Sequence, residues 1–149
     1  MPHAGLMDEK SLGPKEGPFL RARLHIRGGK RRLRQGKIAA GIVTLYDAVL
    51  AAMDSYVASL NGHGTVLEIR RDEDIRDEKV LYGALVRSRV LDGRFDFEAF
   101  NRLVERALDE EMSGYDYQDI LEGVESVMTQ LGVMPFDESL LPPEDPKTF

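Results

Sequence analysis

The sequence contains no cysteine, and this absence removes several kinds of chemistry at once. Disulfide bonds, thiolate nucleophiles and metal centres with cysteine ligands are all excluded. Long apolar runs are also missing, since no uninterrupted apolar stretch approaches the ~20 residues that a membrane-spanning helix needs. The stretch from Met1 to Lys15 lacks the apolar core of a signal peptide. We therefore expect no membrane association and a cytoplasmic location.

Motifs that would identify an enzyme are missing as well. The sequence has no P-loop, no Gly-x-Gly-x-x-Gly and no Gly-x-Ser-x-Gly. The acidic cluster at 72–78 lacks the alternating ligands and the glycine of a calcium loop, and no Glu-x-x-His pair suits a di-iron site. We expect no catalytic residue, no metal and no cofactor, and hence a non-enzymatic role.

The histidines leave one enzymatic alternative open. His3, His25 and His63 are expected in a tail, a strand and a loop. Some small helical ribonucleases place an arginine a few residues before a histidine on a helix. Here Arg21 precedes His25 by four positions, but on a segment that resembles a strand. A nuclease or hydrolase would need a converging polar pocket, which a linear sequence does not reveal.

What the chain does have is the composition of one folded domain. Its 149 residues are 42% hydrophobic and 31% charged, and a domain of this size buries roughly two-thirds of its unfolded surface. The charges are distributed unevenly. Residues 1–37 carry a net charge of +7, and residues 38–149 carry −13. Any contact with a polyanion would therefore have to be local.

The basic segment 21–37 is the candidate binding site. It holds eight Lys and Arg residues and no acidic residue. Several of them come just before a predicted helix, where the positive end of the helix dipole makes each cation unfavourable by a few tenths of a kcal/mol. A bound phosphate, nucleic-acid backbone or acidic peptide would offset both sources of positive charge. The residues we expect to bind such an anion are Arg27, Lys30, Arg31, Arg32, Arg34 and Lys37.

An intramolecular alternative competes with this anion site, because the rest of the chain is strongly acidic. Carboxylates on later helices could neutralise the basic segment without any partner. The segment also lacks interleaved aromatic residues, which argues against base-specific recognition of single strands. The carboxylates we consider for this role are Glu105, Asp109, Glu110, Glu111, Glu122 and Glu125.

The region before the first predicted helix has a strand pattern. Residues 1–18 are rich in proline and glycine and are predicted to form a flexible tail. Apolar and charged residues then alternate over 20–26, which favours a strand, and Gly28-Gly29 could turn a hairpin. The segment 65–70 is also β-leaning and could pair with 20–26. We therefore predict a small two-stranded β patch.

Four helices follow from apolar side chains at three- and four-residue spacing. In the third, Phe97, Phe100, Leu103, Val104 and Leu108 share one side and should face inward. The predicted helices run from Gly36 to Leu60, from Asp72 or Asp74 to about Val90, from Asp96 to about Met112, and from Asp116 to Gly132.

The helix predicted over 36–60 should be central, because its large apolar residues cover an arc of about 180°. Asn61-Gly62 is expected to end it. Its alanines and Gly41 would permit a close crossing with another helix. Three neighbouring helices leave part of such a wide arc uncovered, so we predict self-association, as a homodimer.

The proline-rich C-terminal segment is predicted to be extended and to pack partly back on the body. The expected domain plan is a tail at 1–18, a helical domain at 19–135 and the extended segment at 136–149. The fold class is mainly α: a four-helix bundle-like domain with a small two-stranded β patch near the N-terminus. We expect a protein-interaction or regulatory module, or alternatively a module that binds nucleic acid or an acidic partner through segment 21–37.

Overall fold

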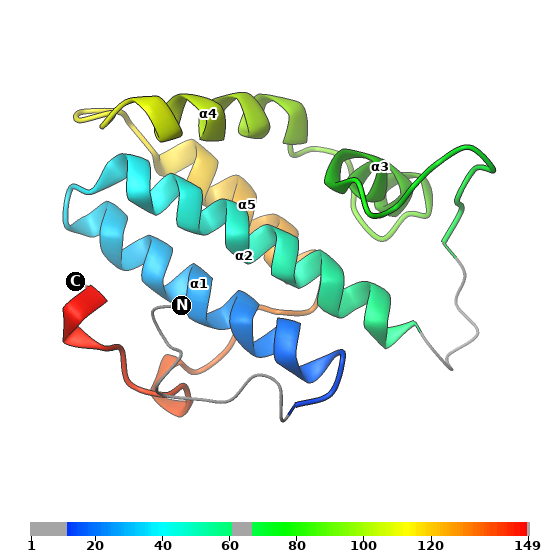
Figure 1. Cartoon of the computed structure of the whole chain (residues 1–149), viewed down its shortest axis with the longest axis horizontal. Helices are drawn as coiled ribbons and strands as arrows, with labels where there is room; N and C mark the ends of the chain where they lie inside the picture. Colours follow the sequence, from blue (N-terminus) through cyan, green and yellow to red (C-terminus); the bar gives the residue numbers. More distant parts are fainter. Residues whose placement is uncertain (1–11, 61–66, 149) are drawn as a thin grey trace.

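The computed structural model describes residues 12–60 and 67–148. Within these residues the protein is mainly helical, as predicted, with five packed helices (Figure 1). They are α1 (Glu16–Arg34), α2 (Ile38–Ser59), α3 (Glu78–Arg87), α4 (Phe97–Asp109) and α5 (Gln118–Gln130). Two short 3₁₀ helices, η2 (Glu138–Leu140) and η3 (Pro146–Thr148), lie in the C-terminal segment.

The predicted β patch is wrong, because residues 20–26 belong to α1, which continues through Gly28-Gly29. No strand occurs in the described part of the chain, and the remainder of the expected partner strand, 65–66, lies outside it. The buried residues Ala22, Ile26, Gly29 and Leu33 recur every three or four positions, which is a helical stripe. The alternating pattern concealed this stripe, since two of its positions are small.

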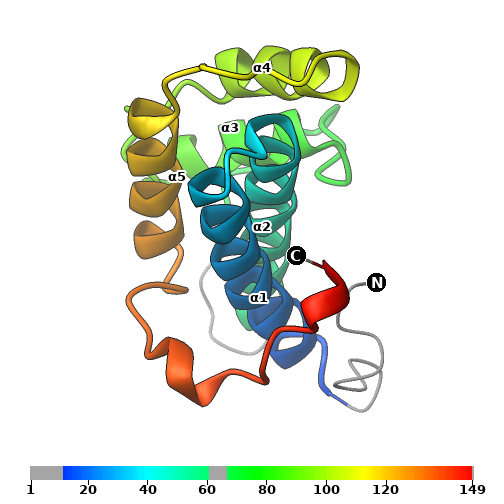
Figure 2. The same cartoon turned by 90° about the vertical axis from the view of Figure 1, so that its left-hand side faces the viewer.

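Close packing of α1 against α2 explains why glycine is tolerated inside α1. The two helices form an antiparallel hairpin and lie side by side in both views (Figures 1 and 2). A Cβ atom at Gly29 would lie 2.9 Å from Leu45 Cδ2. A Cβ atom at Gly41 would lie 2.7 Å from Leu33 Cδ2 and 3.2 Å from the Gly29 carbonyl oxygen. The backbones approach so closely that neither site has room for a side chain.

The helix α2 is central, as predicted, and it contacts each of the other four helices. Among the described residues, the exposed large apolar side chains are Leu12, Ile69, Leu108 and Leu140, and none of these lies in α2. The wide apolar arc is therefore covered within one chain. This removes the observation on which the predicted homodimer was based, and self-association stays a prediction. The predicted cap at 61–62 lies outside the described residues.

By length and composition alone, α2 is long and apolar enough to cross a membrane, unlike what we expected from uninterrupted runs. However, 56% of its apolar window is buried inside the fold. Its Ser55 is buried, and the hydroxyl donates a hydrogen bond to the Lys15 carbonyl oxygen at 3.2 Å. These are properties of a core helix.

Aspartates cap α3 and α4, but not α5. Asp96 Oδ1 accepts a hydrogen bond from Ala99 N at 2.9 Å, as expected. Asp116, which we expected to open α5, lies one residue before the N-cap residue Tyr117, and its Oδ1 accepts from Gln118 N at 3.1 Å. In α3 the cap is Asp77 rather than Asp72 or Asp74, so this helix starts later than predicted. In α4, Phe97, Phe100 and Val104 are buried as predicted. Leu108, however, is 68% exposed, because α4 ends at Asp109 beyond the edge of the core.

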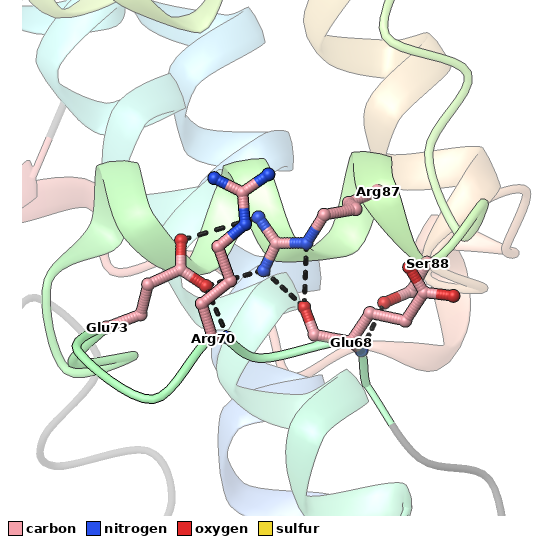
Figure 3. Close-up of polar contacts among 5 residues, drawn as sticks. All are labelled: Glu68, Arg70, Glu73, Arg87 and Ser88. Atoms are coloured by element: carbon pink, nitrogen blue, oxygen red, sulfur yellow. Dashed lines mark hydrogen bonds and ion pairs between the residues drawn. The ribbon is translucent and has the colours of Figure 1, made fainter.

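The segment before α3 is held by one arginine. Arg87 Nε donates to the Glu68 carbonyl oxygen at 2.9 Å, and Arg87 Nη2 donates to Glu73 Oε1 at 2.5 Å (Figure 3). Glu73 Oε1 also accepts from Arg70 N, and Glu68 N donates to Ser88 Oγ, each at 2.7 Å. We call this group (Glu68, Arg70, Glu73, Arg87 and Ser88) the Arg87 clamp.

Candidate functional site: an arginine row under the C-terminal segment

The structure places the predicted anion-binding residues on two helices. Arg27, Lys30, Arg31, Arg32 and Arg34 lie in the second half of α1, and Lys37 is the N-cap residue of α2. Arg31, Arg32 and Arg34 occupy the last turn of α1, where the helix dipole favours cations by a few tenths of a kcal/mol. From the sequence we expected the helix dipole to disfavour these cations, because we assumed that no helix precedes α2. The structure reverses this expectation, since the three arginines lie at the C-terminal end of α1.

Three arginines of α1 contact the C-terminal segment. Arg23, Arg27 and Arg31 recur every four residues, so they share one face of the helix. We call them the arginine row. Residues 133–147 leave the end of α5 and run back alongside α1, as both views show (Figures 1 and 2). The predicted return of this segment onto the body is confirmed by its contacts with the row.

Arg23 holds the first part of the C-terminal segment. Its Nε donates a hydrogen bond to the carbonyl oxygen of the buried Val133 at 3.1 Å. Its guanidinium carbon lies 4.3 Å from the ring centroid of Phe19 and 4.9 Å from that of Phe136. An arginine between two aromatic rings gains cation–π attraction as well as apolar contact. The beginning of the segment is therefore fixed to the core.

Arg27 and Arg31 hold the end of the segment through Glu144. Arg27 Nη2 donates to the Pro142 carbonyl oxygen at 2.7 Å, and Arg27 Nε lies 3.2 Å from Glu144 Oε1. Arg31 Nε donates to Glu144 Oε2, the other oxygen of the same carboxylate. The two arginine side chains are each 12% exposed and that of Glu144 is 19% exposed. The contact is thus an ion cluster with little access to water.

One donor in this cluster is poorly matched. Arg27 Nε is buried, and in the described structure it has no acceptor with hydrogen-bond geometry. It lies within ion-pair distance of Glu144 Oε1, but the oxygen is outside the direction of the N–H bond. A buried donor without a hydrogen bond costs about 1–3 kcal/mol, so this arrangement falls short of the best possible occupant.

Other basic residues of the segment contact the acidic remainder of the chain, as the intramolecular alternative expected. Lys30 Nζ lies 3.4 Å from Glu125 Oε2 on α5, and Arg21 Nη2 lies 3.6 Å from Asp54 Oδ2 on α2. Glu125 was among the expected carboxylates, whereas Asp54 and Glu144 were not. The sequence held one signal for Glu144, since it follows two prolines in a segment expected to pack back.

Arg32 lies on a different face of α1, in a cleft of about 470 Å³ between α1 and α2. Burial lowers the pKa of the Arg32 guanidinium, repulsion from Arg31 lowers it further, and Glu144 opposes this. Arg34 and Lys37 are exposed at the end of the hairpin. The six predicted residues therefore do not form one surface. The cleft is lined by Arg21, His25, Arg32, Thr44, Asp47, Leu50, Ala51 and Asp54.

The Arg21–His25 pair lies on a helix, contrary to the strand context that we expected, and both side chains line this cleft. Facing them on α2 are Asp47 and Asp54. Burial raises the pKa of both carboxyl groups, and the positive charge of Arg21 opposes the rise. A cleft with converging polar side chains, as the nuclease alternative requires, is therefore present. Its walls carry both positive and negative groups.

The N-terminus of α2 was the expected position for an external anion. No side chain caps it. Instead, the backbone carbonyl oxygen of Glu111 accepts a hydrogen bond from Ala39 N at 3.2 Å. Lys37, Glu110 and Glu111 line a cavity of about 390 Å³ beside it. The chain between α4 and α5 therefore supplies an acceptor for one of the free backbone N–H groups at this helix end.

Within residues 12–60 and 67–148, no group of three or more acidic or histidine side chains is arranged to hold a metal ion. In this part of the chain the arginine row and the C-terminal segment that covers it form an ion cluster with little access to water. No protein-family model, curated protein or solved structure matches this chain.

Proposed function

We propose that this protein is a non-enzymatic regulatory interaction module, in which the arginine row of α1 binds an extended acidic segment of a partner protein. The C-terminal segment would occupy the row when the partner is absent. The observation that supports this most directly is that the row already holds an extended, proline-containing segment through Glu144. The proposal keeps the cytoplasm as the expected location.

The way in which the C-terminal segment is held supports exchange. Its beginning is anchored, because Val133 is fully buried and Phe136 packs against the core. Its end has much weaker support, since neither η2 nor η3 packs extensively against any helix and Leu140 is 82% exposed. The contacts to Arg27 and Arg31 thus provide much of what holds residues 137–147. A segment with so little apolar burial can open at low cost in free energy.

The chemistry of the contacts also supports exchange. Arg27 and Arg31 bind a backbone carbonyl oxygen and a carboxylate. Any extended peptide with one acidic residue at the right spacing can supply these two groups. Extended proline-containing segments lose little conformational entropy on binding, because proline has already restricted the backbone.

The nucleic-acid alternative has less support. Of the six residues expected to bind an anion, Arg34 and Lys37 are exposed, whereas Arg27 and Arg31 face the chain's own carboxylate. Affinity for a nucleic acid rises with the number of phosphates that are contacted, and two open cations form a small footprint. An acidic protein segment fits the buried part of the row better.

A binding experiment in trans tests the proposal. The probe is a fluorescent peptide with the sequence of residues 137–147, and the protein is the full chain with Glu144→Ala. An intramolecular segment competes at an effective concentration of about 1 mM, so weakening it should strengthen peptide binding by about tenfold relative to the wild type. Fluorescence anisotropy measures both dissociation constants.

Two further variants identify the surface. Arg27→Ala added to Glu144→Ala should abolish peptide binding, because Arg27 contacts both Pro142 and Glu144. Arg34→Ala added to Glu144→Ala is the matched control, since Arg34 is an exposed arginine of the same helix. If no variant binds the peptide, or if the Arg34 control loses binding equally, the proposed function is wrong.

A further inference from the structure

We propose that the arginine row recognises a phosphorylated residue in the partner's extended segment, and that Glu144 occupies the position of the phosphoryl group. This inference rests on the proposed function, because it names the chemical class of the partner for the same site. It begins from the imperfect match between Glu144 and the two arginines that surround it.

The acceptor geometry favours a group with more oxygens than a carboxylate. Glu144 directs Oε2 to Arg31 Nε, and its planar carboxylate leaves Oε1 beside Arg27 Nε without a hydrogen bond. A phosphate ester carries three terminal oxygens in a tetrahedral arrangement. One oxygen can accept from Arg31 while another accepts from the unmatched Arg27 donor. The buried Arg27 Nε donor would then have an acceptor.

The charge balance points in the same direction. Arg27 and Arg31 are almost buried, and both contact the singly charged carboxylate of Glu144. Besides burial, repulsion from Arg31 lowers the pKa of a third guanidinium, that of Arg32, by more than attraction to Glu144 raises it. A phosphoserine or phosphothreonine carries a charge of about −1.5 to −2 at neutral pH, and it would attract both guanidinium groups more strongly than a carboxylate does.

The backbone contact adds a positional requirement. Arg27 binds the carbonyl oxygen of Pro142 and the side chain of Glu144, which are two residues apart. The favoured partner therefore offers a free carbonyl oxygen two residues before its phosphorylated residue, in an extended backbone. Prolines at the two preceding positions, as in Pro142-Pro143-Glu144, hold the chain in that conformation.

The experiment compares two peptides on one protein. Both have the sequence of residues 137–147, and in one of them Glu144 is replaced by phosphoserine. The protein is the full chain with Glu144→Ala, and anisotropy gives the two dissociation constants. Additional charge-assisted hydrogen bonds should make the phosphorylated peptide bind about tenfold or more tightly. Equal affinities, or tighter binding of the unmodified peptide, would overturn the inference and leave the proposed function intact.

Two controls separate a specific site from general charge attraction. Arg27→Lys, made in the Glu144→Ala chain, keeps the positive charge but removes the Nε–H donor. It should reduce the preference for the phosphorylated peptide to about twofold or less, because lysine cannot bind two oxygens in a fixed fork. Inorganic phosphate is added as a competitor at about a hundredfold excess over the peptide. Full displacement at that excess would mean that the site takes free phosphate, and it would overturn the assignment to a peptide.

Failure of the inference and failure of the proposed function give different results. If neither peptide binds, both are wrong. If only the phosphorylated peptide binds, the inference stands, while the proposed function is wrong for an unmodified acidic segment and the site binds phosphorylated segments alone. A preference for phosphoserine that survives Arg27→Lys unchanged would show that Arg27 does not read the phosphate, and the inference would fail.

Discussion

The Arg87 clamp and the arginine row both use arginine to hold a loop, yet they differ in how well the arginine is matched. In the clamp, Arg87 Nε meets the Glu68 carbonyl oxygen, and its two terminal nitrogens meet the Glu73 carboxylate (Figure 3). In the row, Arg27 Nε is buried without a hydrogen bond. Each of the three guanidinium nitrogens of Arg87 has an acceptor in the clamp, whereas a ligand that offers an acceptor to Arg27 Nε would fit the row better than Glu144 does.

The two regions also differ in how far along the sequence each arginine lies from the residues that it contacts. The partners of Arg87 lie 14 to 19 residues away, so the chain closes a short loop to reach them. Glu144 lies 113 residues from Arg31. Closing a long loop costs more conformational entropy, although the cost grows slowly with length. Local contacts of the first kind re-form readily after they open, and distant ones are easier to replace from outside.

The largest expected effect comes from the helix crossing that supports the row but not the clamp. Gly41→Val should lower the free energy of unfolding by about 2–4 kcal/mol, because the new side chain meets Leu33 and the Gly29 backbone and forces the helices apart. Chemical denaturation measures this. Gly83→Ala is the matched control, since nothing lies within 4 Å of a Cβ atom at that helical glycine. It should be neutral or stabilising by up to ~1 kcal/mol.

The next effect concerns the clamp alone. Arg87→Ala removes every side-chain contact that Arg87 makes to Glu68 and Glu73. Amide hydrogen exchange in residues 67–77 should accelerate by about tenfold or more, because this segment would open locally. Exchange in residues 137–147 should stay unchanged. Acceleration in both segments would mean that the two regions are coupled, and the comparison between them would break.

A smaller effect is expected from the row. Glu144→Gln should accelerate exchange in residues 137–147 while the global free energy of unfolding changes by less than ~1 kcal/mol, because the released arginines become hydrated. Limited proteolysis should then cut this segment first. If Glu144→Gln lowered the global free energy of unfolding as much as Gly41→Val does, the C-terminal segment would be an integral part of the core.

The smallest expected effect is a dependence on pH. The backbone N–H of Arg70 and then the side chain of Arg87 lower the pKa of Glu73 below its ordinary value of 4.5. Because the folded-state pKa is the lower one, this contribution to stability is fully present above 4.5 and is lost as the pH falls through the folded-state value. The protection factors of residues 67–77, which remove the intrinsic pH dependence of amide exchange, should therefore fall in acid. In Glu73→Gln that fall should disappear.

The sequence carried enough information for α2, α4 and α5, because their apolar stripes are local signals, as is the aspartate cap of α4. It failed at α1, where the interface side includes Gly28 and Gly29, and a search for large apolar residues passes over glycine. The occupant of the row was out of reach, since nothing local to Arg31 indicates a carboxylate 113 positions later.

The regular four-residue step of the arginines has a consequence for selectivity. Four residues correspond to a rise of about 6 Å along α1, because the backbone hydrogen bonds of a helix fix its pitch, and the helix packs closely on α2 at Gly29 and Gly41. The arginines of the row are therefore attached to the helix at fixed intervals. A candidate sequence would be accepted or rejected by the interval between its binding groups, whatever its overall acidity.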